Sequence, residues 1–215
     1  MILFQKDVNF KEKMMTKKLF CILSILMVSF FIKTEGKEMD VDFSNLELMI
    51  SQDDIKSKIV QLAETIDDEY KDKEIVFLMI MKGAFIFTSD LVREIKTPFS
   101  IEAIKCSSYG LRGKERGELT IQGLEKLDLK SKHVIVVDDI YDSGKTLSSV
   151  MKEVEKQDPE TLKSLIMLLK KTPKRRANVQ LPNWYLFEIE DKFVVGYGLD
   201  YKEYFRGLKG IYSVE

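Results

Sequence analysis

The segment Val134-Ile-Val-Val-Asp-Asp-Ile-Tyr-Asp-Ser-Gly-Lys-Thr146 combines an apolar run, three carboxylates and a loop of hydroxyl and glycine residues. Its β-branched residues Val134 to Val137 predict a buried strand, and the residues after Gly144 predict the start of an amphipathic helix. The turn between them would present backbone N–H groups at a helix N-terminus, beside the carboxylates at the strand end. The sequence therefore predicts an anion pocket suited to a sugar phosphate.

The last residues of this segment, Ser143 to Thr146, are similar to the end of a Walker A loop, which binds nucleoside triphosphates. That motif requires a glycine five positions before Gly144, but Asp139 stands there. The pattern therefore argues against an NTPase P-loop. A shorter piece of the segment, taken alone, equally fits a strand, an Asp-Ser-Gly turn and a helix cap without any ligand.

Apolar residues after residue 40 alternate between helical spacing and short continuous runs. Helical spacing predicts helices, and continuous runs bounded by turn residues predict strands. Strands that are apolar throughout and alternate with helices are typical of a parallel sheet covered on both faces. We therefore expect an α/β fold with a mostly parallel, doubly wound sheet and a ligand site at the carboxyl ends of its strands. The expected helices contain Ile55 to Ile66, Phe85 to Ile95 and Leu147 to Val154, and the expected strands are Ile75 to Ile80, Phe99 to Ile104, Glu118 to Ile121, Val134 to Val137, Ser164 to Leu169 and Phe193 to Tyr197.

Composition limits the classes of ligand and partner. The 215 residues include 34 Lys plus Arg and 35 Asp plus Glu, so the net charge gives no reason to expect binding to nucleic acid or to an anionic membrane. Two cysteines, Cys21 and Cys106, do not form a disulfide framework, and the lone His133 has no partners at zinc spacing. We therefore expect one domain, with any metal held by oxygen ligands.

The N-terminal region has the pattern of a targeting segment. Four lysines between residues 11 and 18 precede the apolar run Leu19 to Ile32, which is short for a membrane span and similar in length to the core of a signal peptide. No small-residue cleavage site follows this run. A start assigned too early, with Met39 as the true beginning, explains the same pattern. We expect residues 1–39 to be a leader outside the fold and residues 40–215 to form the domain of a cytoplasmic protein; export or anchoring through residues 19–32 is the alternative.

The segment Val134 to Thr146 resembles the phosphoribosyl pyrophosphate (PRPP) motif of type I phosphoribosyltransferases: four apolar residues, two acids, two variable residues and Asp-Ser-Gly-Lys-Thr. The resemblance implies that family's fold, with a small hood formed by the N- and C-terminal segments. It implies that Asp138 and Asp139 bind the ribose hydroxyls and Mg²⁺, although many relatives have Glu in place of Asp138. It also implies a phosphate-binding loop made of Ser143, Gly144, Lys145 and Thr146.

Met81-Lys82-Gly83-Ala84 resembles the pyrophosphate loop of hypoxanthine-guanine phosphoribosyltransferases. The resemblance implies that Lys82 and Gly83 bind pyrophosphate and that the peptide before Lys82 is cis. By itself, the tetrapeptide equally fits an ordinary turn with a solvated lysine. Ser108-Tyr109 resembles the start of the same family's lid loop, which would exclude water from the reaction. A solvated hairpin tip is the alternative at that position.

The carboxyl end of the strand expected at Ser164 to Leu169 is followed by Lys170. It aligns with a family lysine that donates a hydrogen bond to the exocyclic oxygen of a 6-oxopurine. Because lysine is only a donor, such a contact favours hypoxanthine or guanine over adenine. By the same resemblance Asp142 faces N7 of the purine and acts as a general base or electrostatic partner. Taken alone, Lys170 fits a solvated basic turn better than a purine contact.

The segment Phe187 to Arg206 resembles the C-terminal signature of the same family. The resemblance implies that Phe193 stacks on the purine and that Val194 offers backbone groups to the base edge. It implies that Asp200 binds Mg²⁺ and that Arg206 binds pyrophosphate oxygens. For an isolated residue, core packing of the phenylalanine and a surface salt bridge of the arginine are the commoner arrangements, but twenty matched positions in order outweigh them.

Together these resemblances imply a Mg²⁺-dependent purine salvage enzyme that transfers the 5-phosphoribosyl group from PRPP to N9 of hypoxanthine or guanine, giving IMP or GMP and pyrophosphate. They also imply a homodimer or homotetramer whose other partners are small-molecule substrates. Two alternatives stay open: a xanthine-preferring sister transferase, and a PRPP-sensing regulator that binds nucleic acid. The regulator would need a basic surface or an added DNA-binding domain, and the sequence shows neither.

Overall fold

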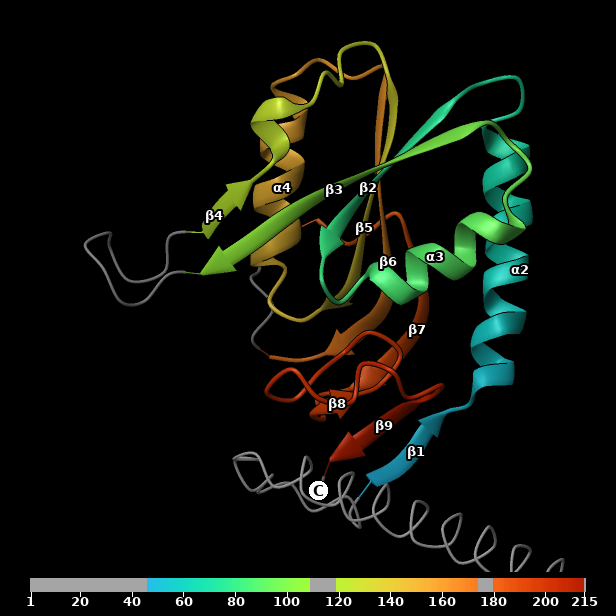
Figure 1. The fold of residues 1–215 in the computed structure, drawn as a ribbon, viewed down its shortest axis with the longest axis vertical. Coiled ribbons are helices and arrows are strands. Elements are labelled where there is room, and N and C mark those ends of the chain that lie inside the picture. Colours follow the sequence, from blue (N-terminus) through green and yellow to red (C-terminus); the bar gives the residue numbers. More distant parts are fainter. Residues whose placement is uncertain (1–45, 109–118, 174–179, 215) are drawn as a thin grey trace, which may run out of the picture. The chain divides into compact units, whose positions relative to one another are not determined.

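The computed structural model describes residues 46–108, 119–173 and 180–214. These residues form a central sheet with a layer of helices on each of its two faces (Figure 1). In these residues the sheet has six strands in the order β4-β3-β2-β5-β6-β7. All neighbouring pairs are parallel except β3 and β4, which are antiparallel. The mostly parallel sheet expected from the sequence is therefore confirmed. The strands are β2 Ile75–Met81, β3 Phe99–Ser108, β4 Leu119–Gln122, β5 His133–Tyr141, β6 Thr161–Lys171 and β7 Trp184–Glu190.

Helices cover both faces of this sheet because its central strands are apolar on both sides. Phe77 and Met79 of β2 pack in the same apolar cluster as α2 (Gln52–Glu69) and α3 (Phe85–Glu94). Leu78 and Ile80, which point to the opposite face, pack in a second cluster with α4 (Lys145–Glu155). Figure 1 shows α2 and α3 on one side of the sheet and α4 on the other. The doubly wound arrangement is therefore confirmed.

A second, smaller sheet forms the expected hood. β1 (Leu46–Ile50) pairs antiparallel with β9 (Ile211–Val214), which in turn pairs antiparallel with β8 (Val194–Val195). Figure 1 shows this sheet at the bottom of the described unit, below β7 and α2. Segments from the two ends of the described chain thus meet in one sheet, as the family resemblance implied.

Several boundaries differ from those expected from apolar runs. β5 continues through Asp138 to Tyr141, because an acid at the end of a strand keeps its extended backbone when the next strand pairs with it. The strand expected over Phe193 to Tyr197 consists only of Val194 and Val195, since Gly196 (φ 99°) and Tyr197 (φ 49°) turn the chain. β7 was not expected, because its apolar run Trp184 to Phe187 is short and its exposed and buried positions do not alternate regularly.

Some expectations fall on residues outside the described ranges. Residues 1–39, including the apolar run Leu19 to Ile32, and the lid residue Tyr109 are among them. In the described ranges, no helix is both long and apolar enough to span a membrane. The leader therefore stays a prediction.

Candidate active site

The carboxyl ends of the parallel strands bring the predicted site residues to one edge of the sheet. Tyr141, the last residue of β5, lies level with Leu169 of β6; Asp142 follows Tyr141 along the chain, and Lys170 follows Leu169 within β6. Lys170 is in turn level with Ile189 of β7. Residues separated by 28 positions in the sequence thus become neighbours, and the edge is the one predicted to bind a ligand.

The loop between β5 and α4 has the geometry of an anion site. Gly144 is the N-cap of α4 with φ 75°, a left-handed conformation that glycine adopts at little cost. The backbone N–H of Ser148 donates to the carbonyl of Gly144 at 3.0 Å, which starts the helix. The first turn of α4 leaves backbone N–H groups that its own helix does not use, and the helix dipole favours negative charge there. This loop is therefore suited to a phosphate.

Asp138, which is buried, and Asp139, which is half-buried, form an acidic pair at the end of β5. The Asp138 side chain is almost inaccessible, and its Oδ1 accepts a hydrogen bond from the backbone N–H of Asp139 at 3.0 Å. Burial, and then the neighbouring charge of Asp139, raise the pKa of Asp138 well above its usual value. Burial also raises the pKa of Asp139, although hydrogen bonds and the Arg206 charge oppose this rise. The pair therefore favours a proton, a hydroxyl donor or a cation close by.

The chemistry of this acidic pair fits Mg²⁺. Carboxylate oxygens are ligands that Mg²⁺ prefers, and a divalent cation would offset the cost of two adjacent buried charges. Among the described residues, His, Cys, Asp and Glu side chains do not gather in threes as a complete metal site. Asp200, the third predicted ligand, instead pairs with Arg206 at 2.7 Å. Mg²⁺ would therefore need further oxygens from water or substrate, as is usual for this ion.

Asp142 follows β5 and has an unused acceptor. Its Oδ1 is buried and has no hydrogen-bond partner among the described residues. Buried polar atoms are nearly always paired in folded proteins, so an unpaired oxygen at a strand end requires an explanation. A ligand that carries a donor would supply the missing partner. We call Asp138, Asp139 and Asp142 together the acidic floor.

The loop after β2 lies against the acidic floor and the C-terminal segment. The Met81–Lys82 peptide is cis, as the resemblance implied. A Cβ added to Gly83 would lie 1.5 Å from Oδ2 of Asp139, so this glycine contacts the carboxylate directly. A Cβ added to Gly198 would lie 2.1 Å from the carbonyl oxygen of Gly83. The absence of side chains at both glycines therefore lets three segments of the chain approach one another.

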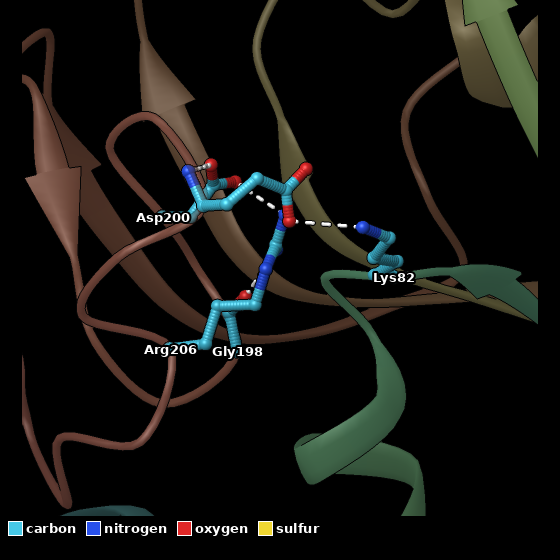
Figure 2. A network of polar contacts seen from close by, with 5 residues as sticks. Lys82, Gly198, Asp200 and Arg206 are labelled. Atoms are coloured by element: carbon cyan, nitrogen blue, oxygen red, sulfur yellow. Dashed lines mark hydrogen bonds and ion pairs between the residues drawn. The ribbon is translucent and has the colours of Figure 1, made fainter. Parts of the chain in front are cut away.

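A network of charged groups lies above this contact. Lys82 Nζ lies 2.9 Å from Glu203 Oε2, which is also 3.3 Å from Nη2 of Arg206. Arg206 donates to the carbonyl of Gly198 at 2.7 Å and lies 2.7 Å from Asp200. Figure 2 shows Lys82 on the loop after β2, facing Arg206, Gly198 and Asp200 of the C-terminal segment. We call Lys82, Asp200, Glu203 and Arg206 the charged rim.

The predicted purine-binding residues lie at the ends of β6 and β8. Lys170 is buried, and its Nζ lies 3.6 Å from Oδ1 of Asp191, two residues before Phe193. The Phe193 side chain is 51% exposed and meets Tyr201 edge to face, with the ring centroids 5.8 Å apart. A flat apolar surface is therefore available close to a buried cation.

The backbone of Val194 faces the free edge of the hood sheet. The N–H of Val214 donates to the carbonyl of Phe193 at 3.0 Å, so these two opposed residues form a hydrogen-bonded pair of the antiparallel ladder. In such a ladder hydrogen-bonded pairs alternate with non-bonded pairs, and Val194 opposite Ser213 belongs to the second kind. Its N–H and carbonyl groups therefore point away from β9, toward the outer edge.

Three residues of this region were not expected from the sequence: Asp191, Tyr201 and Glu203. Asp191 orients Lys170, and Tyr201 supports the Phe193 ring. Glu203 joins Lys82 across 121 positions of sequence. No local spacing rule connects residues so far apart, so only the folded arrangement could reveal them. Ser108, predicted to begin the lid, is the last residue of β3.

Comparisons with known proteins agree with this geometry. The phosphoribosyl transferase domain family matches residues 51–202. The chain is 39% identical over 171 residues to a hypoxanthine-guanine phosphoribosyltransferase of Aquifex aeolicus, covering 79% of this chain and 95% of that one. It is 35% identical to the hypoxanthine phosphoribosyltransferase of Escherichia coli over the same shares of both chains. A crystal structure of a hypoxanthine-guanine phosphoribosyltransferase from Bacillus anthracis superposes with a TM-score of 0.72 at 36% identity, covering 79% of this chain and 98% of that one. The chain therefore belongs to the phosphoribosyltransferase family, in its hypoxanthine-guanine branch.

Proposed function

We propose that this protein is a purine salvage enzyme that transfers the 5-phosphoribosyl group of PRPP to N9 of hypoxanthine or guanine, giving IMP or GMP and pyrophosphate. The observation that carries the proposal is that Asp142 and Lys170 directly follow a pair of strand residues, Tyr141 and Leu169, at one sheet edge, and that Asp142 also precedes a helix N-terminus suited to phosphate. Relatives that bear this activity in their names span most of the chain.

The loop from Ser143 to Thr146 binds the 5-phosphate in this proposal. Backbone N–H groups at the start of α4 and the hydroxyls of Ser143 and Thr146 donate to its oxygens. Asp138 and Asp139 accept hydrogen bonds from the ribose hydroxyls, and these donors stabilise the ionised form of two carboxyls whose pKa values burial raises.

Lys170 and Asp142 select and prepare the purine. The buried ammonium of Lys170, held by Asp191, donates to the exocyclic oxygen at C6. The unpaired Oδ1 of Asp142 accepts the proton at N7, which raises the electron density at N9 as the new bond to C1 of the ribose forms. Phe193 lies against one face of the ring, and the outward N–H and carbonyl groups of Val194 meet its edge.

Lys82, Gly83 and Arg206 bind the departing pyrophosphate. Breaking the bond between C1 and pyrophosphate is the difficult step, and negative charge grows on the leaving oxygens. The forked guanidinium of Arg206 and the ammonium of Lys82 would stabilise that charge. Mg²⁺, when held by Asp138, Asp139 and Asp200 together with substrate oxygens, supplies further stabilisation of the same charge.

Release of pyrophosphate tests the proposal. PRPP and Mg²⁺ are incubated with the protein and hypoxanthine, guanine, xanthine or adenine in parallel. We expect rapid release with hypoxanthine or guanine and little with adenine, whose 6-amino group opposes the Lys170 donor. Preference for xanthine would replace the substrate assignment, and no release with any base would refute the proposed activity.

Location and assembly complete the proposal. We expect a cytoplasmic enzyme, because PRPP is made and used in that compartment, and a homodimer or homotetramer. A study of the Trypanosoma cruzi hypoxanthine phosphoribosyl transferase concerns the role of its C-terminal region in oligomeric state. Light scattering of the purified protein measures the assembly, and mass spectrometry of the native N-terminus shows whether residues 1–39 are retained.

A further inference from the structure

The side chain of Glu203 forms ion pairs with Lys82 and Arg206, the two cations assigned above to pyrophosphate. Its Oε2 lies 2.9 Å from Nζ of Lys82 and 3.3 Å from Nη2 of Arg206. The lysine and the glutamate are 121 positions apart and belong to different parts of the fold, the loop after β2 and the C-terminal segment. A carboxylate between an ammonium and a guanidinium is in the position that an oxygen of a bound anion would take.

Glu203 is held there by charge rather than by packing. Its side chain is 64% exposed, and that of Lys82 is 54% exposed. Hydrogen bonds from Lys82 and Arg206 hold the pKa of Glu203 below its usual value, so the carboxylate is ionised at neutral pH. Its backbone has φ 71° and donates to Oδ2 of Asp200 at 2.8 Å, which fixes where the side chain starts. The side chain itself is therefore free to rotate away.

Arg206 keeps its position when Glu203 leaves. The guanidinium also donates to the carbonyl of Gly198 at 2.7 Å and pairs with Asp200 at 2.7 Å, both shorter than its contact with Glu203. Lys82, by contrast, has Glu203 as its ion-pair partner among the described residues. Loss of the glutamate contact thus releases donors on both cations without dismantling the site.

We propose that Glu203 is an internal competitor for the pyrophosphate group: it binds Lys82 and Arg206 in the free enzyme and is displaced when PRPP or pyrophosphate binds. The inference rests on the proposed function, since it assigns these cations to pyrophosphate. Displacement follows from charge, because a carboxylate and a pyrophosphate oxygen repel each other when they share the same donors. Glu203 therefore weakens PRPP binding and favours release of the pyrophosphate product.

The expected size of the effect is small, because exposed ion pairs contribute little to equilibria. Removal of the competing charge is expected to tighten binding by about two- to fivefold. The substitution Glu203→Gln keeps the shape of the side chain and removes its charge. Glu203→Ala removes the charge without introducing a side-chain amide. If the two variants behave alike, contacts made by the new amide of Glu203→Gln do not explain the result.

The full-length protein is titrated with inorganic pyrophosphate at saturating Mg²⁺ in a calorimeter, and KM is measured for PRPP and for hypoxanthine. We expect both variants to lower the dissociation constant of pyrophosphate and the KM for PRPP, with the KM for hypoxanthine unchanged. Glu153→Gln is the matched control, because Glu153 forms an ion pair at 2.7 Å with Lys156, the C-cap residue of α4. It is expected to change none of these constants.

Unchanged or weaker pyrophosphate binding in the Glu203 variants overturns the inference, since the glutamate would then be neutral or would support the site. Wild-type protein that neither binds pyrophosphate nor releases it from PRPP refutes the proposed function and this inference with it. Active wild-type enzyme whose affinity does not respond to the Glu203 substitutions refutes the inference alone. The two failures are thereby distinguishable.

Discussion

The acidic floor and the charged rim are both polar clusters at the same sheet edge, but they are built in opposite ways. The floor comes from one short segment at the end of β5, and in the described residues none of its three acids forms an ion pair. The rim comes from two distant segments, and its four residues pair with one another. In the floor Asp138 is buried and the other two acids are half-buried, whereas Lys82 and Glu203 of the rim are mostly exposed.

This difference separates two ways of preparing a site for an anion-rich substrate. Buried acids without an ion-pair partner are costly to the fold, so the floor holds charges whose counter-charge arrives only with the ligand. Paired surface charges cost little, but a ligand must displace one of them. Substitutions in the floor should therefore change catalysis or stability strongly. Substitutions of residues that lie in neither cluster and only connect the hood to the main sheet should have small effects.

The largest effect is expected for Asp142→Asn in the floor. The amide keeps the shape of the side chain but is a poor acceptor for the N7 proton, so kcat should fall by about 10²- to 10⁴-fold. Nucleotide binding and the melting temperature should remain close to wild type. Asp128→Asn, which changes an acid in an exposed turn, is the control. A kcat near wild type in Asp142→Asn would remove this residue from the proposed role.

Lys170→Ala is expected to have the next largest effect. Loss of a charge-assisted hydrogen bond costs about 1.5–3 kcal/mol, so the KM for hypoxanthine should rise by roughly tenfold or more, with a smaller change for PRPP. The neighbouring Lys171 is exposed and pairs with Glu190 at 3.3 Å, so Lys171→Ala is a matched control. Equal rises in both KM values for Lys170→Ala would count against purine selection by this lysine.

Asp138→Asn tests the cost of the floor to the fold. Because burial and Asp139 raise the folded-state pKa of Asp138, the folded protein binds this proton more tightly than the unfolded chain does. Wild-type stability should therefore fall as pH rises from the unfolded-state pKa, about 4, through the raised folded-state pKa. The asparagine variant lacks this loss and should be more stable at pH 7 by about 0.5–2 kcal/mol, with weaker PRPP binding.

Urea unfolding between pH 4 and pH 8 in the presence of a chelator measures this difference without bound metal. The extra stability of Asp138→Asn over wild type should shrink toward the acidic end of the range, because Asp138 of the wild type then becomes protonated in the unfolded state as well as in the folded state. If Asp138→Asn is less stable than wild type at pH 7, the carboxylate supports the fold. That result would contradict the view that the acidic floor is costly to the fold.

The smallest effect is expected for Tyr197→Phe, which touches neither cluster. The Tyr197 hydroxyl donates to Oδ2 of Asp90 on α3 at 2.7 Å and so connects the hood to the main sheet's helices. Asp90 keeps its pairing with Arg93 at 2.7 Å, so the variant should lose only about 0.5–1.5 kcal/mol of unfolding free energy. Tyr185→Phe, at an exposed position on β7, should lose none. A large fall in kcat for Tyr197→Phe would show that the hood contact takes part in the chemistry.

The parts of the fold that were predicted correctly are those with strong local patterns. The strand Val134 to Val137 and the helix after Gly144 were identified from β-branched residues and helical spacing, which act over a few neighbouring positions. β1, β7 and β9 were missed because short or half-exposed strands are stabilised mainly by their partners in the sheet. The cis peptide before Lys82 was implied by the family resemblance and is confirmed.

The sequence by itself determined the alternation of strands and helices, the acids after β5 and the glycine turn into α4, because each depends on interactions between residues close along the chain. Only the tertiary structure decided that Asp191 meets Lys170, that Gly198 rests on Gly83, and that Glu203 lies between Lys82 and Arg206. These contacts join segments whose separation in sequence carries no periodic signal. They arise from the parallel register of the sheet and from the pairing of β1 with β9, which places the C-terminal segment over the strand ends.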